Sequence, residues 1–128
     1  MTELCFRDGI MDRIRMRDPR YHEGAYLFVL AALEHSQSRL AERRHISGPE
    51  LATSVRELAL AKFGVVAKLV LEHWGVRTTS DIGDIVFTLV DLGLLISQPN
   101  DTREEFSGLF DFGQAFEQEY PWSAATLV

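Results

Sequence analysis

The most constraining feature of the sequence is the tetrapeptide Ser47-Gly48-Pro49-Glu50. A serine followed three residues later by a glutamate predicts a capping box, in which each side chain accepts a hydrogen bond from the other residue's backbone N–H. Proline fits the first turn of a helix because the N–H that it lacks would have no intrahelical partner. The tetrapeptide therefore predicts the start of a helix in the middle of the chain. The apolar residues that follow have helical spacing: Leu51, Val55, Leu58 and Ala59.

Two further helices are predicted before this point. Thr2 can cap a first helix that runs to about Met16, and Asp18-Pro19 ends it, because the residue before a proline is pushed out of helical geometry. A second helix is predicted from Glu23 to about Arg43, and it contains the longest apolar run, Ala25 to Leu33. Nine residues are far fewer than the roughly 20 that span a bilayer. The run therefore predicts a buried helix segment and no membrane anchor.

A short fourth helix is predicted to follow the third. Gly64 is well placed to end the third helix, and Gly75 to end the fourth, since glycine adopts the left-handed conformation common at helix ends. The spacing of the apolar residues predicts an inward face made of Val66, Leu69, Val70 and Trp74.

A fifth helix, capped by Thr79, Ser80 or Asp81, is expected to end at Gly93. Its inward stripe is Ile82, Ile85, Val86 and Leu89. Leu94 to Ser97 then has the pattern of a strand, and Phe106, Phe110 and Phe112 lie at the even spacing of a returning strand. Three helices and a hairpin over residues 48 to 112 resemble a winged helix, a helix-turn-helix variant with a β-hairpin wing.

The predicted fold is therefore mainly α, a five-helix domain with a winged-helix-like second half that ends in a short β-hairpin. With 128 residues, one domain is expected. It divides into an N-terminal helical pair (1–46), a winged-helix-like core (47–112) and a C-terminal segment (113–128). Apolar residues make up 46% and charged residues 25%, which is typical of a globular protein and excludes a disordered or collagen-like chain.

Charge argues against nucleic acid as a partner. The net charge is −6, and residues 48 to 128 hold five Lys or Arg against twelve acids. The fifth helix would be the recognition helix of a winged helix, yet it carries Asp81, Asp84 and Asp91 and no cation. Groove insertion needs cations for phosphates and Arg, Asn or Gln for base edges. Charge alone therefore argues against DNA binding through this helix.

Two groups of residues remain as candidates for interaction. Arg39, Arg43 and Arg44 form a basic cluster that either stabilises the C-terminus of the second helix through its dipole, which we favour, or contacts an acidic partner. Tyr120 and Trp122 end an aromatic-rich last quarter, which is either packed on the helical core, the favoured interpretation, or exposed as an interface.

No pattern indicates a catalytic, cofactor or metal site. The four histidines form no i, i+4 pair, and the single cysteine, Cys5, has no partner for a disulfide or a zinc site. The nine glycines are dispersed and form no phosphate-binding loop. We therefore predict no catalytic residues, no metal and no cofactor. The lone cysteine and the absence of a leader pattern favour a cytoplasmic location.

The chain also resembles a family of short bacterial conserved hypothetical proteins. The stretches that carry the resemblance are Asp18-Pro19-Arg20-Tyr21, Ala25-Tyr26-Leu27-Phe28-Val29, Arg43-Arg44-His45-Ile46-Ser47-Gly48, Phe63-Gly64, Trp74-Gly75-Val76-Arg77, Gly83 to Leu95 and Phe110-Asp111-Phe112. The family has no assigned reaction, ligand or functional residue, so the resemblance implies none. The segment after Glu119 lies outside it.

Three classes of function are left open by the sequence. A cytoplasmic protein-interaction or regulatory scaffold module, binding a protein partner or a second copy, ranks first because acidic charge and missing catalytic motifs favour it. A nucleic-acid-associated winged-helix protein ranks second, and a small enzyme ranks third.

Overall fold

The computed structural model describes residues 10–99 and 101–118. Five α-helices occur in this part of the chain: α1 (Ile10–Arg17), α2 (Glu23–Ser38), α3 (Gly48–Phe63), α4 (Ala67–His73) and α5 (Thr79–Asp91). Three short helical turns accompany them: η1 (Gly64–Val66), η2 (Arg103–Phe106) and η3 (Gln114–Gln118). The predicted mainly helical fold with five helices is confirmed for these residues. None of the described helices is both long enough and apolar enough to cross a membrane.

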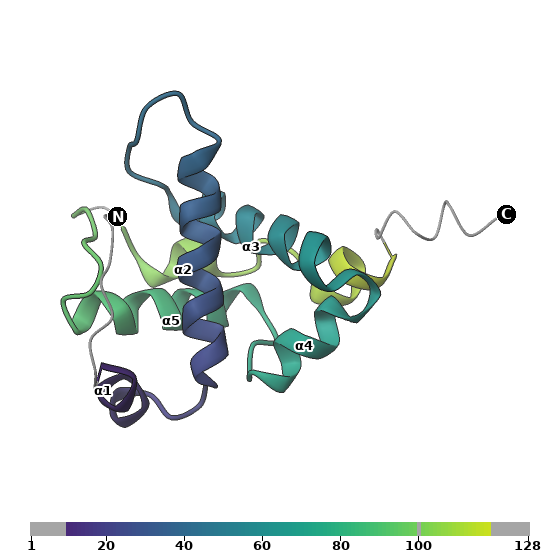
Figure 1. Cartoon of the computed structure of the whole chain (residues 1–128), viewed down its shortest axis with the longest axis horizontal. Coiled ribbons are helices and arrows are strands. Elements are labelled where there is room, and N and C mark those ends of the chain that lie inside the picture. Colours follow the sequence, from purple (N-terminus) through teal and green to yellow (C-terminus); the bar gives the residue numbers. More distant parts are fainter. Residues whose placement is uncertain (1–9, 100, 119–128) are drawn as a thin grey trace, which may run out of the picture.

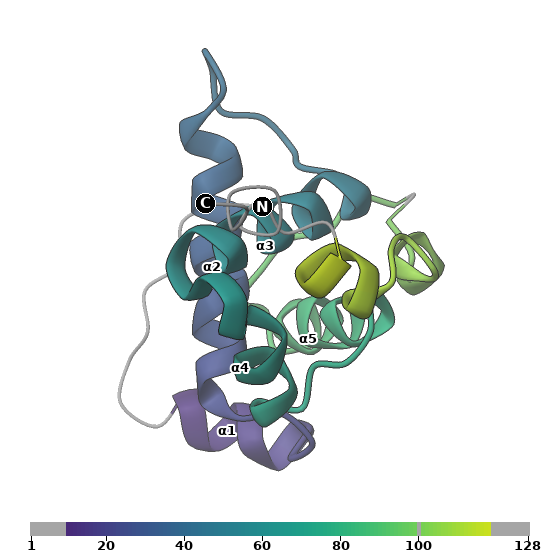
Figure 2. The ribbon, with the colours of Figure 1, turned by 90° about the vertical axis from the view of Figure 1, so that its right-hand side faces the viewer.

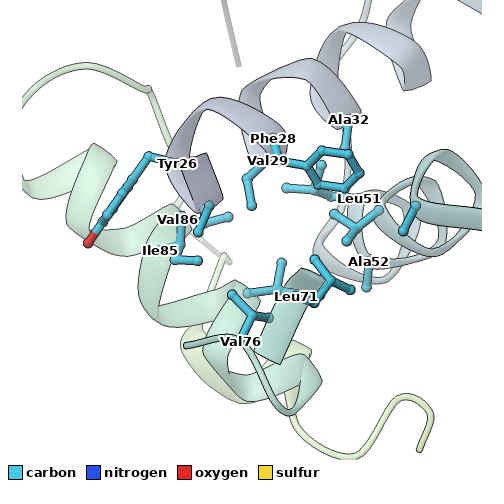
Figure 3. Close-up of a cluster of buried hydrophobic side chains, with 14 of the residues drawn as sticks. Tyr26, Phe28, Val29, Ala32, Leu51, Ala52, Leu71, Val76, Ile85 and Val86 are labelled. Carbon is cyan, nitrogen blue, oxygen red and sulfur yellow. The ribbon is translucent and has the colours of Figure 1, made fainter. Parts of the chain in front are cut away.

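Helix α2 lies at the centre of the arrangement, with α3 and α5 packed against it (Figure 1). Most of its apolar run is buried, as predicted: Tyr26 and Ala32 are fully buried and Val29 is 3% exposed, whereas Leu27 is 49% exposed. Figure 3 shows how these side chains meet Leu51, Leu71 and Ile85 from three other helices in a single cluster. Helix α2 therefore supplies one wall of a core to which each of the later helices contributes.

The helix boundaries follow local signals in the sequence at most positions. Ser47 and Glu50 form the predicted capping box at the start of α3. A second capping box, made by Thr78 and Asp81, starts α5 one residue earlier than predicted. The three predicted helix stops have positive φ angles: Gly64 (57°), Gly75 (93°) and Gly93 (75°).

Helix α2 is shorter than predicted, because it ends at Ser38 and not near Arg43. Gln37 is buried, and its side-chain amide donates to the carbonyl oxygen of Arg44 and accepts from the backbone N–H of the same residue. The chain therefore leaves the helix after Ser38 and returns past Gln37 to bury Ile46, which is 1% exposed. The sequence offers no proline or glycine at this point, so only a tertiary contact ends the helix.

The predicted inward face of α4 is wrong for Val66 and Leu69. Ala67 is fully buried and Leu71 is 2% exposed, whereas Val66 and Leu69 are 45% and 67% exposed. Trp74, just after the helix, is partly buried against Phe28 and Phe63, with ring centroids 5.7 and 5.8 Å away. The helix is therefore turned so that Ala67 and Leu71 face the core and Leu69 faces outward.

The predicted β-hairpin is not found in the described residues between Leu94 and Phe112, which contain no strand. Instead, this stretch forms η2, which packs along α5. Phe106 is 2% exposed and fills the space left by two glycines. A Cβ atom at Gly83 would lie 2.9 Å from Cβ of Phe106, and one at Gly48 would lie 3.1 Å from its ring. The segment expected to form a wing is therefore part of the core.

The aromatic last quarter is packed on the helices as far as the structure describes it, as the favoured interpretation predicted. Phe112 and Phe116 are 4% and 1% exposed, and Phe110 is partly buried beside them. The rings of Phe112 and Phe116 meet edge to face at 5.1 Å. Tyr120 and Trp122 lie outside the described residues.

Candidate functional site

The structure places the three predicted interaction arginines around the connection between α2 and α3. Arg39 follows α2 directly, and Arg43 and Arg44 lie in the connection. Each is paired with a glutamate: Arg39 with Glu57, Arg43 with Glu34 at 3.1 Å, and Arg44 with Glu50 at 2.7 Å. The cluster is therefore close to neutral and ties the connection to both helices. Neither a phosphate backbone nor an acidic partner meets an excess of positive charge here.

Glu50 is the carboxylate most affected by this arrangement. The Arg44 guanidinium, together with the backbone N–H of Ser47, lowers the pKa of Glu50 to about 2. The two Arg44 nitrogens lie 3.1 and 2.7 Å from the two carboxylate oxygens, which is a bidentate geometry. The capping box and the ion pair thus share one carboxylate.

Replacement of Glu50 by glutamine is expected to destabilise the protein at neutral pH by about 1 kcal/mol or less, because the side chain is 43% exposed and solvent screens the pair. The folded-state pKa lies below the ordinary value of 4.5, so this contribution is complete above about pH 4.5 and is lost as the pH falls toward 2. Urea unfolding of both proteins between pH 7 and pH 3 measures it. A difference that stays constant with pH would contradict the expectation.

A groove of about 470 Å³ lies between the end of α2, the connection and the start of α3. Ile46 lies at the groove beside Ser36 and Ser54, whose buried hydroxyls hydrogen-bond to each other. Arg39 and Glu57, already paired, form part of its rim. The groove therefore offers satisfied polar groups to a ligand, because the two carboxylates that line it, Glu50 and Glu57, are paired with Arg44 and Arg39.

The aspartates of α5 are occupied by structural contacts. Asp81 accepts a hydrogen bond from the hydroxyl of Tyr21 at 2.6 Å, and Asp84 accepts one from the same hydroxyl at 3.1 Å. Asp84 also pairs with Arg103 at 2.9 Å, and Asp91 pairs with Arg17 at 2.9 Å. These contacts tie α5 to α1, to the residues before α2 and to η2. They give the acids of this helix a structural role in place of the cations that a recognition helix would need.

The same network shifts three pKa values. Arg20 contacts Asp18 through two hydrogen bonds of 2.9 and 2.6 Å, and it holds the pKa of that carboxyl below its ordinary value. Burial, followed by the hydrogen bond to Asp81, raises the pKa of Tyr21. Burial also raises the pKa of Tyr26 to about 12. Both tyrosines therefore stay protonated at neutral pH and act as hydrogen-bond donors within the fold.

A different surface stands out by its apolar character. Val65, Val66 and Leu69 are 57%, 45% and 67% exposed, and they lie within five residues of each other on η1 and the first turn of α4. Residues i and i+3 or i+4 are neighbours on a helix, so these side chains form one patch, which we call the α4 surface. Other exposed apolar residues, such as Met16, Leu27 and Ile96, are spread along the chain.

The charge around the α4 surface differs from that of the whole protein. Residues 58 to 71 contain no acid and both lysines of the chain, Lys62 and Lys68. Lys68 lies 3.7 Å from Glu72 at the next turn of α4. The patch is thus apolar, and the lysine within α4 is paired with a glutamate of the same helix.

Sequence reasoning missed this surface because it assigned Val66 and Leu69 to the core. One signal could have found it: Val66, Ala67, Leu69, Val70 and Leu71 spread apolar side chains over more than half of the circumference of a short helix. So wide an apolar arc cannot be buried completely against one neighbouring surface. Within residues 10–99 and 101–118, no group of three or more His, Cys, Asp or Glu could hold a metal ion.

The family resemblance noted in the sequence stays a prediction. Searches of protein-family models, curated proteins and solved structures give no match to this chain.

Proposed function

We propose that the protein is a protein-interaction module and that the α4 surface is its docking site. The observation that carries the proposal is the exposure of Val65, Val66 and Leu69 on one face, while the apolar residues Ala67 and Leu71 of the same helix are buried. Adjacent apolar side chains left in water are the usual mark of an interaction surface. The proposal places the module in the cytoplasm, in keeping with its lone cysteine.

The two other function classes receive less support. The winged-helix proposal needs a helix free to enter a groove, but α5 is packed against α1, α2, α3 and η2, and its aspartates are paired. The arginines beside the α2–α3 groove are paired with glutamates. A small enzyme would need a reactive group, and the groove serines Ser36 and Ser54 bond to each other. An apolar docking surface requires neither feature.

Leu69→Asp tests the proposal. The immobilised wild-type chain is used to capture proteins from the cells that express it. The variants Leu69→Asp and Ile96→Asp are immobilised and used in the same way. Ile96 is 63% exposed and lies outside the α4 surface, so it is the matched control. A partner is expected to be retained by the wild type and by Ile96→Asp and to fall at least about tenfold with Leu69→Asp, because a charge in an interface centre is costly.

Two results of the capture experiment would contradict the proposal. If no captured protein depends on Leu69, or if Ile96→Asp reduces capture equally, the α4 surface is not the docking site. Leu69 is two-thirds exposed, so its substitution should leave the fold intact, and circular dichroism and the midpoint of thermal unfolding verify this for each variant.

A further inference from the structure

The end of α4 is fastened to the start of α2 through four residues that we call the α2–α4 junction: His22, Gly24, His73 and Trp74. The backbone N–H of His22 donates to the carbonyl oxygen of Trp74 at 3.0 Å. A Cβ atom at Gly24 would lie 2.7 Å from the indole of Trp74, so a larger residue here would displace the ring. Figure 2 shows the end of α4 beside the start of α2. The two helix ends are therefore in direct contact.

The ring of His22 caps α2 at this junction. Its Nδ1 atom accepts a hydrogen bond from the backbone N–H of Gly24 at 2.9 Å. A ring nitrogen that accepts a hydrogen bond carries no proton, so the contact requires the neutral ring with its proton on Nε2. Ser, Thr and Asn, which are common capping residues, accept such a bond whatever the pH. Histidine loses this ability when it takes up a second proton.

A protonated His22 would meet three unfavourable conditions. Both ring nitrogens would be donors, and Nδ1 would face the N–H of Gly24. The N-terminus of a helix carries a partial positive charge, which disfavours a cation. The ring of His73, the last residue of α4, lies 6.3 Å from the ring of His22 between centroids. If both rings are protonated, their like charges repel each other.

The other charged groups next to these two rings come from three places. Arg20, on the chain before α2, pairs with Asp18 at 2.6 Å. Glu72 of α4 lies 3.7 Å from Lys68, and Glu23 belongs to the first turn of α2. Histidine is the side chain that ordinarily changes its charge between about pH 5 and pH 8. The response of the junction in this range is therefore assigned to its two histidines.

We propose that the α2–α4 junction is a pH-sensitive fastening of α4 that weakens on acidification, with His22 as the sensor and His73 as its repelling neighbour. An unfolded chain has no cap to lose, so the stability that the cap contributes is present at pH 8 and is lost as the pH falls toward 5. Because Leu69 lies on α4, the junction also regulates the α4 surface. This last step rests on the proposed function, whereas the pH response of the junction does not.

Urea unfolding at pH 8 and pH 5 tests the sensor. His22→Asn keeps a capping side chain that does not titrate. The ratio of folded to unfolded wild type is expected to fall about fivefold more than that of His22→Asn, which corresponds to the loss of one cap. His35→Asn is the matched control, because His35 lies in the last turn of α2, where a protonated ring is favourable. Its ratio should fall at least as much as that of the wild type. An equal fall in the wild type and in His22→Asn overturns the proposal.

Fluorescence of Trp74 locates the response at the junction. The chain has two tryptophans, so the full-length Trp122→Phe variant reports on Trp74 alone. Local opening of the junction between pH 8 and pH 5 is expected to increase acrylamide quenching of Trp74 about twofold, and added His22→Asn should keep the quenching constant. Quenching that does not change with pH in either protein means that the junction stays closed, and this result contradicts the proposal.

Nitrogen-15 NMR of the His22 ring tests the premise of the proposal. At pH 8 the ring proton is expected on Nε2, because Nδ1 accepts the hydrogen bond from Gly24. A proton found on Nδ1 would show that His22 does not cap α2, and the sensor would be lost with the cap.

Capture at two pH values separates this inference from the proposed function. If both hold, a partner that depends on Leu69 is retained less well by the wild type at pH 5 than at pH 8, and His22→Asn retains it equally at both. A pH response of the junction without any Leu69-dependent partner supports the sensor and removes the docking site. Leu69-dependent capture that falls equally in the wild type and in His22→Asn supports the docking site and refutes its regulation by the junction.

Discussion

Replacement of Phe106 by alanine is expected to lower the free energy of unfolding by about 3–5 kcal/mol, the cost of emptying a buried aromatic site. The ring is 2% exposed and lies between Gly83 of α5 and Gly48 of α3. Both glycines let the ring approach so closely that a Cβ atom at either position would contact it.

Chemical unfolding followed by circular dichroism measures this cost. Leu109→Ala serves as a control from the same stretch of chain, because Leu109 is 36% exposed, and its substitution should change stability by no more than about 0.5 kcal/mol. Phe106→Leu should cost less than Phe106→Ala, since part of the volume is kept. A loss below about 1 kcal/mol for Phe106→Ala would show that the segment after α5 is not part of the core.

The second large effect on stability is expected at Leu71 of α4, and Leu69 of the same helix is the comparison. Leu71→Ala is expected to cost about 2–5 kcal/mol, because Leu71 is 2% exposed and lies in the central cluster (Figure 3). Leu69→Ala should change stability by about 0.5 kcal/mol or less, because Leu69 is 67% exposed. The two substitutions remove the same atoms from the same helix, so helix propensity cancels in the comparison.

Urea unfolding of the two variants decides between the observed orientation of α4 and the one that its sequence predicted. The sequence placed Leu69 inward, which would give the opposite order of stabilities. Equal losses would mean that both leucines are buried and that the α4 surface does not exist. This comparison therefore also tests the basis of the proposed function.

Local signals explain which parts of the fold could be predicted. A capping box depends on residues only three positions apart, so Ser47 and Glu50 were enough to place the start of α3. The same holds for the glycine stops, and for the buried run of α2, whose length and apolar character leave no other place for it. These predictions depend on the chain within one or two helical turns.

Tertiary contacts determine the parts of the fold that could not be predicted from the sequence. In α4, apolar residues cover more than half of the circumference, so packing decides the orientation, and Trp74 packs against Phe28 and Phe63 just after the helix. After α5, the backbone N–H groups of Leu94 and Leu95 donate to the carbonyl oxygen of Leu89. The chain therefore turns back on α5, where a strand was expected from the alternation of apolar residues.

The candidate site was predictable only in part, for a similar reason. The sequence identified Arg39, Arg43 and Arg44 as a basic cluster, but their partners Glu57, Glu34 and Glu50 come from two helices, and sequence distance alone does not reveal such pairs. The α4 surface consists of residues that the sequence placed in the core. The α4 surface could be identified only from the structure, which shows which side of α4 faces outward.

The burial of Phe106, Phe112 and Phe116 has a consequence for the order of events during synthesis. These three rings come from the last quarter of the chain, yet they pack against helices made earlier. A nascent chain that has reached only the end of α5 lacks them, and the faces that they cover stay open to water. Exposed apolar surface on incomplete chains attracts chaperones and other nascent chains. Folding of this core is therefore completed only when Phe116 has left the ribosome.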